Sequence, residues 1–371
     1  MRRLLVLLAA LLVTAASAQD YVIGIVYDAG GKFDGSFNEG TWRGVERAAA
    51  DLETEGLEIE IVEFEATPDT AAEGQRRIAG QGADLIVAPG FLQADAIQAV
   101  STEFTDTAFV LIDAVAENPN VRSVLFKEQE GSFLVGYIAG KLTRTGVVGF
   151  VGGMDIPLIH AFDLGYQEGV KAAGADCTII SNYVGVTPDA WNDPARAREL
   201  AATQNAQGAD IIFAAAGASG NGVIDYANQT MCFTPSVPLR DTPLVAQLEA
   251  VAKPAGFDAA CGAGSTPVFF IGVDSNQNPL GDTDGDPTTL NFGLTSMLKR
   301  VDVASYNAVM DVVNGTFEGG LLNLGLAEDG VDFALDEYNE ALIPQELVDE
   351  VNDVKQRIID GDIVVTDYRT L

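Results

Sequence analysis

The stretch from Asp28 to Gly40, DAGGKFDGSFNEG, carries side chains that could hold a small flat ligand. Phe37 offers an aromatic face for stacking, and the Asn38 amide offers one acceptor and two donors to the edge of a stacked ring. The stretch follows the apolar run YVIGIVY and precedes residues with helical spacing, and α/β sheets bind ligands beyond the C-terminal ends of their strands. The pattern predicts a ligand loop, although a plain turn with Ser36 or Asn38 as helix cap fits the spacing equally well.

Two further acids and one lysine end apolar runs that are typical of strands. Asp113 follows VLI in TAFVLIDA, Asp274 closes PVFFIGVD, and Lys299 closes NFGLTSMLK. Side chains at the C-terminal ends of parallel strands face one crevice, so Asp113 is predicted to contact a ligand rather than only to form a turn. Lys299 could donate to ligand hydroxyls while Asp274 balances its charge, and the alternative is a solvated strand end.

The segment AAAGASGNG contains Gly217 and Gly220, small residues that let backbone amides approach a ligand closely. The sequence has neither the GxGxxG pattern of dinucleotide-binding turns nor the lysine of a phosphate-binding loop. The glycines therefore indicate a close backbone approach to a ligand and, by themselves, no nucleotide site.

Strands alternate with helices along both halves of the chain, which predicts parallel sheets with right-handed crossovers. About 350 mature residues exceed what one core usually organises. We therefore expect an α/β protein of two lobes, each a parallel sheet flanked by helices, with a cleft between them. The expected N-terminal lobe is 19–125 plus 300–319, and the expected C-terminal lobe is 126–299 plus 320–371. The chain would then cross between the lobes three times, and such crossings act as a hinge.

The first 18 residues combine Arg2 and Arg3, the apolar run LLVLLAALLV and an Ala-Ser-Ala end. This pattern predicts a cleavable signal peptide whose apolar part is too short to span a membrane. We expect the mature chain to be exported and soluble. A net charge of −33 argues against nucleic acid as a partner, because its phosphates would be repelled.

Three cysteines, Cys177, Cys232 and Cys261, can oxidise in an exported chain. Cys232 and Cys261 bracket a proline-rich segment of weak periodicity. We expect a disulfide between them, at the base of an inserted loop of about 231–267. Cys177, in CTIISNYV, is interpreted as a buried strand thiol.

No pair of catalytic groups stands out in the sequence. The single histidine, His160, lies in an apolar segment with no Cys or Ser placed to form a triad. HExxH and CxxC are absent, so zinc is not expected. The acidic stretch 282–287, DTDGDP, lacks the spacing of an EF-hand loop and is interpreted as an exposed turn, with calcium binding as the alternative. We expect a binding protein without metal or cofactor, and no enzyme.

Taken together, these segments resemble the basic membrane protein family of solute-binding proteins, whose best-known branch is the purine nucleoside receptor A-like proteins of ABC transporters. The resemblance covers nearly the whole mature chain. The similar segments, in order, are DGSFNEG at 34–40, the Asp after VLI at 113, GSFLVGYIAG at 131–140, VGFVGGMDIPLIHAFDLGYQEGVKA at 148–172, AAGASGNGV at 215–223, GVDSNQ at 272–277 and TSMLKRVD at 295–302.

The resemblance implies a type I periplasmic binding protein fold and a receptor that captures guanosine, inosine or adenosine and delivers it to an ABC permease. In such a site, Phe37 and Asn38 would hold the base, and Asp113 would accept hydrogen bonds from its N–H groups. Asp274 and Lys299 would bind the ribose hydroxyls. The remaining contacts implied are Asp28 and the backbone amides near Gly217.

Two features depart from the family pattern. Many members are lipoproteins, whereas no cysteine stands at the predicted cleavage site here, which implies a freely diffusing periplasmic receptor. We also expect this receptor to be a monomer. The stretch 231–267 is also longer than the family usually carries.

Two further questions remain open from the sequence. Trp191, in DAWNDP, is the expected second stacking partner of the base, or else a packing residue beside a helix cap. A sugar or other polyol would use the same Asp and Lys contacts without a base. A nucleoside-processing enzyme would need a repeated Asp motif that is lacking at the first strand end.

Overall fold

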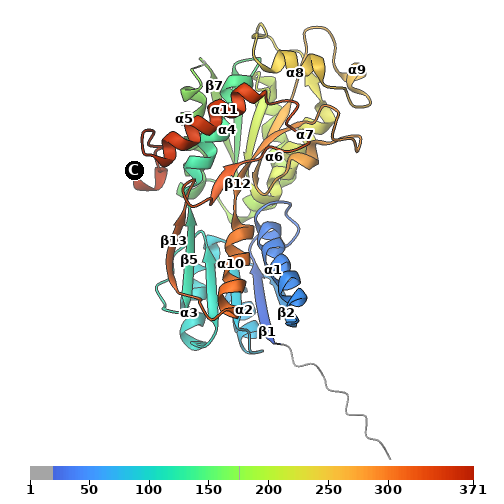
Figure 1. Ribbon diagram of the computed structural model, residues 1–371. Helices are drawn as coiled ribbons and strands as arrows, with labels where there is room; N and C mark the ends of the chain where they lie inside the picture. Colours follow the sequence, from blue (N-terminus) through green and yellow to red (C-terminus); the bar gives the residue numbers. More distant parts are fainter. Residues whose placement is uncertain (1–19, 175) are drawn as a thin grey trace, which may run out of the picture.

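A sheet of six parallel strands forms the centre of the N-terminal lobe (Figure 1). The computed structural model describes residues 20–174 and 176–371, so the predicted signal peptide at 1–18 lies outside the described residues. The strand order is β13-β5-β4-β3-β1-β2. The strands are β1 (Tyr21–Tyr27), β2 (Ile59–Glu65), β3 (Leu85–Pro89), β4 (Ala108–Ile112), β5 (Val121–Phe126) and β13 (Gly320–Leu324).

Helices cover both faces of this sheet. They are α1 (Phe37–Thr54), α2 (Ala71–Ala79), α3 (Ala94–Glu103) and α10 (Val301–Val313). Alternate strand residues point to opposite faces: Ile23 and Ile25 are buried with α1 and α10, whereas Val26 is buried with α2 and α3. A strand that is covered on both faces needs apolar residues at nearly every position, which explains the continuous apolar runs in the sequence.

The second lobe repeats this architecture with the order β14-β12-β11-β8-β6-β7, in which β14 alone is antiparallel to its neighbour. The strands are β6 (Val147–Met154), β7 (Thr178–Gly185), β8 (Ile211–Ala215), β11 (Phe269–Asp274), β12 (Gly293–Lys299) and β14 (Val331–Phe333). The flanking helices are α4 (Glu128–Leu142), α5 (Pro157–Ala172), α6 (Pro194–Ala206), α7 (Asn221–Thr230) and α11 (Gln345–Ile359). The predicted two-lobed α/β fold is therefore confirmed.

The chain passes between the lobes three times, after β5, after β12 and after β13 (Figure 1). The third crossing lies later than the expected boundary after residue 319. β13 pairs in parallel with β5, from Gly320 opposite Arg122 to Leu324 opposite Phe126, so it belongs to the first sheet. This edge strand is largely exposed and therefore lacks the apolar run that marked the central strands.

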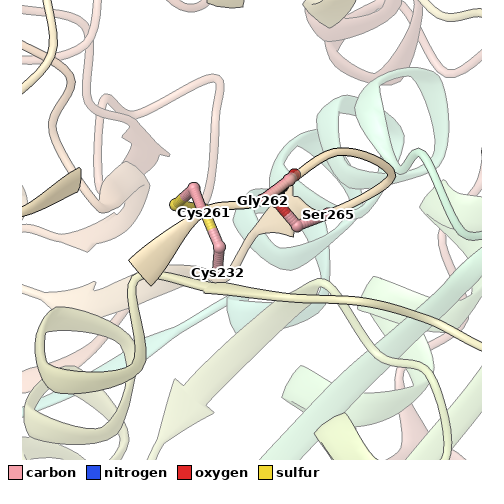
Figure 2. Close-up of a disulfide and its surroundings, with 4 residues drawn as sticks. All are labelled: Cys232, Cys261, Gly262 and Ser265. Atoms are coloured by element: carbon pink, nitrogen blue, oxygen red, sulfur yellow. Dashed lines mark hydrogen bonds between the residues drawn. A yellow bond between two sulfur atoms is a disulfide. The ribbon is translucent and has the colours of Figure 1, made fainter. Parts of the chain in front are cut away.

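The segment 231–267 forms four short elements: β9 (Cys232–Phe233), α8 (Leu244–Ala250), α9 (Phe257–Ala260) and β10 (Thr266–Pro267). A disulfide joins Cys232 to Cys261, which is the pairing expected from the sequence (Figure 2). In the adjoining turn, the Ser265 hydroxyl donates to the Gly262 carbonyl at 2.7 Å. Helices α8 and α9 lie at the end of the second lobe that is farthest from the first lobe (Figure 1).

Cys177 differs from the expected buried strand thiol. It lies immediately before β7 and is half-buried, with an Arg240 guanidinium nitrogen 3.4 Å from its sulfur. Across residues 20–174 and 176–371, no helix has both the length and the apolar character that a membrane crossing requires.

Candidate functional site

A cleft between the two lobes is lined by most of the ligand-contact residues expected from the sequence. It contains about 580 Å³ of space free of protein atoms, part of it open to solvent. The expected residues that line it are Asp28, Phe37, Asn38, Asp113, Trp191, Gly217, Asp274 and Lys299. Gly220 is not among the lining residues; it is buried at the end of the 3₁₀ turn η3 (Gly217–Gly220), where it approaches Ala214.

Asp113 and Asp274 occupy corresponding positions in the two lobes. Asp113 directly follows β4, and Asp274 is the last residue of β11. Both have a positive φ, 70° and 61°, a left-handed conformation that costs a non-glycine residue about 1 to 2 kcal/mol. Backbone strain of this kind persists where the surroundings fix it, and it is concentrated at functional sites.

Lys299 is the centre of the charge network in the cleft. Its side chain is 2% exposed, and its Nζ lies 2.6 Å from Asp113 Oδ2 and 3.2 Å from Glu128 Oε1. Burial alone would lower the pKa of Lys299, but these two carboxylates, with Asp274, raise it above its usual value. Asp274 was the expected counter-ion, whereas the structure places Asp113 and Glu128 in direct contact with the ammonium.

Three aromatic rings surround the same ammonium group. Lys299 Nζ lies 5.1 Å from the ring centroid of Phe37, 5.2 Å from that of Phe126 and 5.6 Å from that of Phe162. The negative ring faces attract the cation and exclude water from it. This cation and an aromatic face therefore occupy the same wall of the cleft.

The loop before α1 is organised by two polar side chains. Asp34 accepts hydrogen bonds from the backbone N–H groups of Ser36, Asn38 and Glu39 and so caps the start of α1. The Asn38 amide accepts from the backbone N–H of Asp28 at 3.2 Å and donates to backbone carbonyls of the same loop. Asn38 thus holds the loop that carries Asp28, in addition to lining the cleft.

Trp191 faces the cleft from the second lobe, at the end of the 3₁₀ turn η2 (Pro188–Trp191). Its ring lies against the backbone of Gly153, where an added Cβ would come within 2.4 Å of the indole, and near Gly217. Glycine is required at position 153 because only a residue without a side chain leaves room for the ring. The turn thereby provides an aromatic surface on the wall formed by the second lobe.

Hydrogen bonds from the turn 34–36 of the first lobe reach the second lobe. The Ser36 hydroxyl donates to Asp274 Oδ2 at 2.7 Å, and the Ser275 hydroxyl donates to the Ser36 carbonyl at 2.8 Å. Gln277 Nε2 donates to the Gly35 carbonyl at 3.0 Å. These contacts hold the two lobes together beside the cleft.

Several site residues were not predicted from the sequence. The additional lining residues are mostly apolar: Ala29, Asp34, Gly90, Phe91, Leu158, Ile159, Phe162, Ala215, Ala216 and Val273. Phe162 has the spacing of an ordinary core residue in α5, so nothing in the pattern separates it from packing. Glu128 is fully buried behind Lys299, and its only signal was an acid in the first turn of a helix that follows a lobe crossing.

Burial changes the acidity of three carboxyl groups around the cleft. Burial raises the pKa of Asp274 to about 7, although Lys299 and the Ser36 hydroxyl lower it. Burial also raises the pKa of Asp28 and of Asp34 to about 6, against the effect of their backbone hydrogen bonds. In each case the folded protein holds a proton at a higher pH than the unfolded chain does.

We expect the ligand-free protein to be more stable near pH 5 than near pH 8. A carboxyl group whose pKa is raised by folding stabilises the folded state as the pH falls through that pKa toward its unfolded value near 4. The melting temperature of Asp274→Asn should fall less steeply between pH 5 and pH 8, because the amide cannot ionise yet keeps a partner for Ser36. Identical slopes for the parent and the variant would contradict the raised pKa of Asp274.

His160 and the acidic stretch lie outside the cleft lining. His160 is held between Asp155 and Tyr183, each at 2.8 Å, and stacks on Tyr368. The carboxylates at 282–286 accept hydrogen bonds from their own turn. Within the described residues, no group of three or more His, Cys, Asp or Glu side chains is arranged to hold a metal ion.

Comparisons with known proteins agree with this geometry. The family model described as ABC transporter substrate-binding protein PnrA-like (Bmp) matches residues 22–231. The CD4+ T-cell-stimulating antigen of Listeria monocytogenes is 33% identical over 94% of this chain and 89% of its own length. The ABC transporter nucleoside-binding protein BmpA of Lactococcus lactis is 29% identical over 93% of this chain and 89% of its own length.

A crystal structure of an ABC transporter solute-binding protein from Aeropyrum pernix has a TM-score of 0.71 and 26% identity, and the match covers 93% of this chain and 94% of that one. The expected solute-binding fold and the resemblance stated from the sequence are both confirmed. The family match spans β1 to the start of the inserted segment and includes most of the cleft. The chain therefore belongs to the Bmp family of PnrA-like ABC transporter substrate-binding proteins.

Proposed function

We propose that this protein is an extracytoplasmic receptor that binds a purine nucleoside in the interlobe cleft and delivers it to an ABC permease. The signal-peptide pattern at 1–18 and the substrate-binding family support this location. The name of the Lactococcus lactis relative, a nucleoside-binding protein, supports this ligand class.

The observation that carries the proposal is an unused acceptor in the cleft. Asp113 Oδ2 is bound by Lys299, while Asp113 Oδ1 is buried and has no hydrogen-bond partner among the residues that the structure describes. A buried carboxylate oxygen without a partner is costly, and an N–H donor of a ligand would satisfy it. Purines such as guanine and hypoxanthine present N–H donors on the ring edge beside a flat apolar face.

The walls of the cleft match the rest of a nucleoside. Phe37 on the first lobe and Trp191 on the second provide aromatic faces for a base. Asp274 and Lys299 lie together at the strand ends, where they can accept from and donate to ribose hydroxyls. A polyol would use this second pair without needing the aromatic faces.

The charges of the cleft favour a nucleoside over a nucleotide. The acids Asp28, Asp34, Asp113 and Asp274 line the cleft. Lys299 is the single cationic side chain in the described lining and is already paired with two carboxylates. A phosphate group would add negative charge with no free cation among the described lining residues to receive it. We therefore propose an unphosphorylated ligand.

Calorimetry with inosine, guanosine, inosine 5′-monophosphate and ribose tests the proposal. We expect the two nucleosides to bind, the monophosphate to bind at least about tenfold more weakly, and ribose to bind weakly. A hundredfold excess of ligand over its dissociation constant should add about 2.7 kcal/mol to the stability. Release of free base during long incubation would refute a pure binding role, and ribose bound as tightly as inosine would favour the polyol receptor.

A further inference from the structure

The C-terminal end of the chain reaches the charge network of the cleft. The 3₁₀ turn η5 (Tyr368–Thr370) packs against α5, and the chain ends beside this helix in Figure 1. In this turn, Tyr368 stacks on His160. From this turn Arg369 extends inward, and its side chain is 25% exposed. Its Nη1 lies 3.0 Å from Glu128 Oε2, and its Nη2 donates to the Phe126 carbonyl at 3.0 Å.

Glu128 connects this arginine to the lysine of the cleft. One carboxylate oxygen of Glu128 faces Arg369, and the other lies 3.2 Å from Lys299 Nζ. Lys299 in turn contacts Asp113 at 2.6 Å. Four charges of alternating sign therefore run from the C-terminal turn to the cleft, and Glu128 itself is fully buried.

The balance among these four charges determines where the Lys299 ammonium group is held. With Arg369 in place, Glu128 has a second cation, so Asp113 can keep the shorter contact with Lys299. Without Arg369, two buried carboxylates would compete for one ammonium group, and Glu128 would draw it away from the cleft.

We propose that Arg369 is a positioning residue of the ligand site, which acts through Glu128 to hold Lys299 against Asp113 and toward the ligand. This inference rests on the proposed function for its ligand, and it adds to that function a dependence of affinity on the C-terminal turn. Arg369 lines no part of the cleft itself; its effect passes through two buried side chains.

The protonation of Glu128 distinguishes this positioning role from one in which Arg369 only holds the C-terminal turn in place. Burial raises the pKa of Glu128, and Lys299 and Arg369 oppose that rise. Loss of Arg369 removes one opposing charge, so Glu128 takes up a proton at a higher pH and then releases Lys299. Other charged groups also act on these three side chains: Asp113 acts on all of them, Asp274 acts on Lys299, and Asp367 acts on Arg369.

The test measures inosine affinity from pH 5.5 to pH 8.5 in Arg369→Gln. We expect a loss of about tenfold relative to the parent protein at pH 8.5 and a return toward the parent as the pH falls toward 5.5 and Glu128 takes up a proton. Arg369→Lys should retain most of the affinity. Arg357→Gln is the matched control, because it also replaces an arginine by glutamine. Arg357 lies on the surface of α11, where its Nη1 is 3.9 Å from Asp353 Oδ2.

A double variant decides whether the effect passes through Glu128. Glu128→Gln with Arg369→Gln removes both charges and leaves the Lys299 pair with Asp113, so the affinity should return to within about threefold of the parent. The inference would be overturned if Arg369→Gln lost the same inosine affinity at every pH and the double variant did not restore it. That result would show that Arg369 only holds the C-terminal turn in place.

A measurement without ligand keeps the inference separate from the proposed function. In ligand-free protein, the ¹³C signal of the Glu128 carboxyl group should titrate at a higher pH in Arg369→Gln than in the parent. Equal titration midpoints would overturn the inference even if inosine binds. A parent protein that does not bind inosine would refute the nucleoside proposal, and the titration would still decide the role of Arg369.

Discussion

Replacement of Lys299 by methionine is expected to lower the free energy of unfolding by about 3 to 5 kcal/mol. The variant removes the cation that contacts both Asp113 and Glu128, and the side chains of all three residues are at most 6% exposed. Two buried carboxylates would then face each other without the ammonium between them. Denaturant unfolding of the ligand-free protein at pH 7.5 measures the difference.

Lys355→Met is the control for this variant. Lys355 contacts Asp332 at 2.8 Å, but its side chain is 21% exposed, so its loss should cost at most about 1 kcal/mol. The difference between Lys299→Met and the parent should also shrink as the pH falls, because burial raises the pKa of Glu128 and its carboxyl group can then take up a proton. A cost below about 1 kcal/mol at pH 7.5 would show that the network contributes little to stability.

Replacement of Asp113 by alanine should weaken inosine or guanosine binding by about tenfold to more than a hundredfold. The proposed site uses Asp113 Oδ1 as a charged acceptor for base N–H groups, and such a hydrogen bond contributes roughly 1.5 to 3 kcal/mol. The variant also leaves Lys299 with Glu128 as its remaining contact at hydrogen-bond distance. Calorimetry with each nucleoside gives the size of the effect.

Two comparisons identify which part of the ligand Asp113 contacts. Asp274→Ala should penalise every ligand with ribose hydroxyls and penalise 2′,3′-dideoxyinosine least, whereas Asp113→Ala should hardly change the weak binding of ribose. Asp95→Ala, an exposed position on α3, should bind inosine like the parent. If Asp113→Ala also retains the parent affinity, Asp113 does not contact the base, and a polyol ligand becomes the better proposal.

The positions of the cleft residues followed from the sequence because they depend on local patterns. Asp113, Asp274 and Lys299 each end an apolar run, and the ends of parallel strands meet at one edge of a sheet. The two lobes followed from chain length and from the repeated alternation of strands and helices. The place of β13 did not follow from the sequence. β13 is a largely exposed edge strand, so it lacks the continuous apolar run that marks a buried strand.

The contacts between these residues depend on the tertiary structure. The sequence indicated Asp274 as the counter-ion of Lys299, but the folded chain places Asp113 and Glu128 against the ammonium and pairs Asp274 with the Ser36 hydroxyl. Asn38 was expected to present its amide to a ligand, and the structure shows that amide hydrogen-bonded to its own loop. Pattern and spacing place a side chain at an edge of a sheet without giving its rotamer or its partner.

The sequence by itself determined the α/β class, the two lobes, the family resemblance and the strand ends that carry the cleft residues. Each of these depends on hydrophobic periodicity or on contiguous sequence motifs. The tertiary structure alone decided the charge network, because Lys299 and Arg369 lie far along the chain from Asp113 and Glu128. Interactions between charges depend on distance and burial, and neither quantity exists until both lobes and the C-terminal turn have packed together.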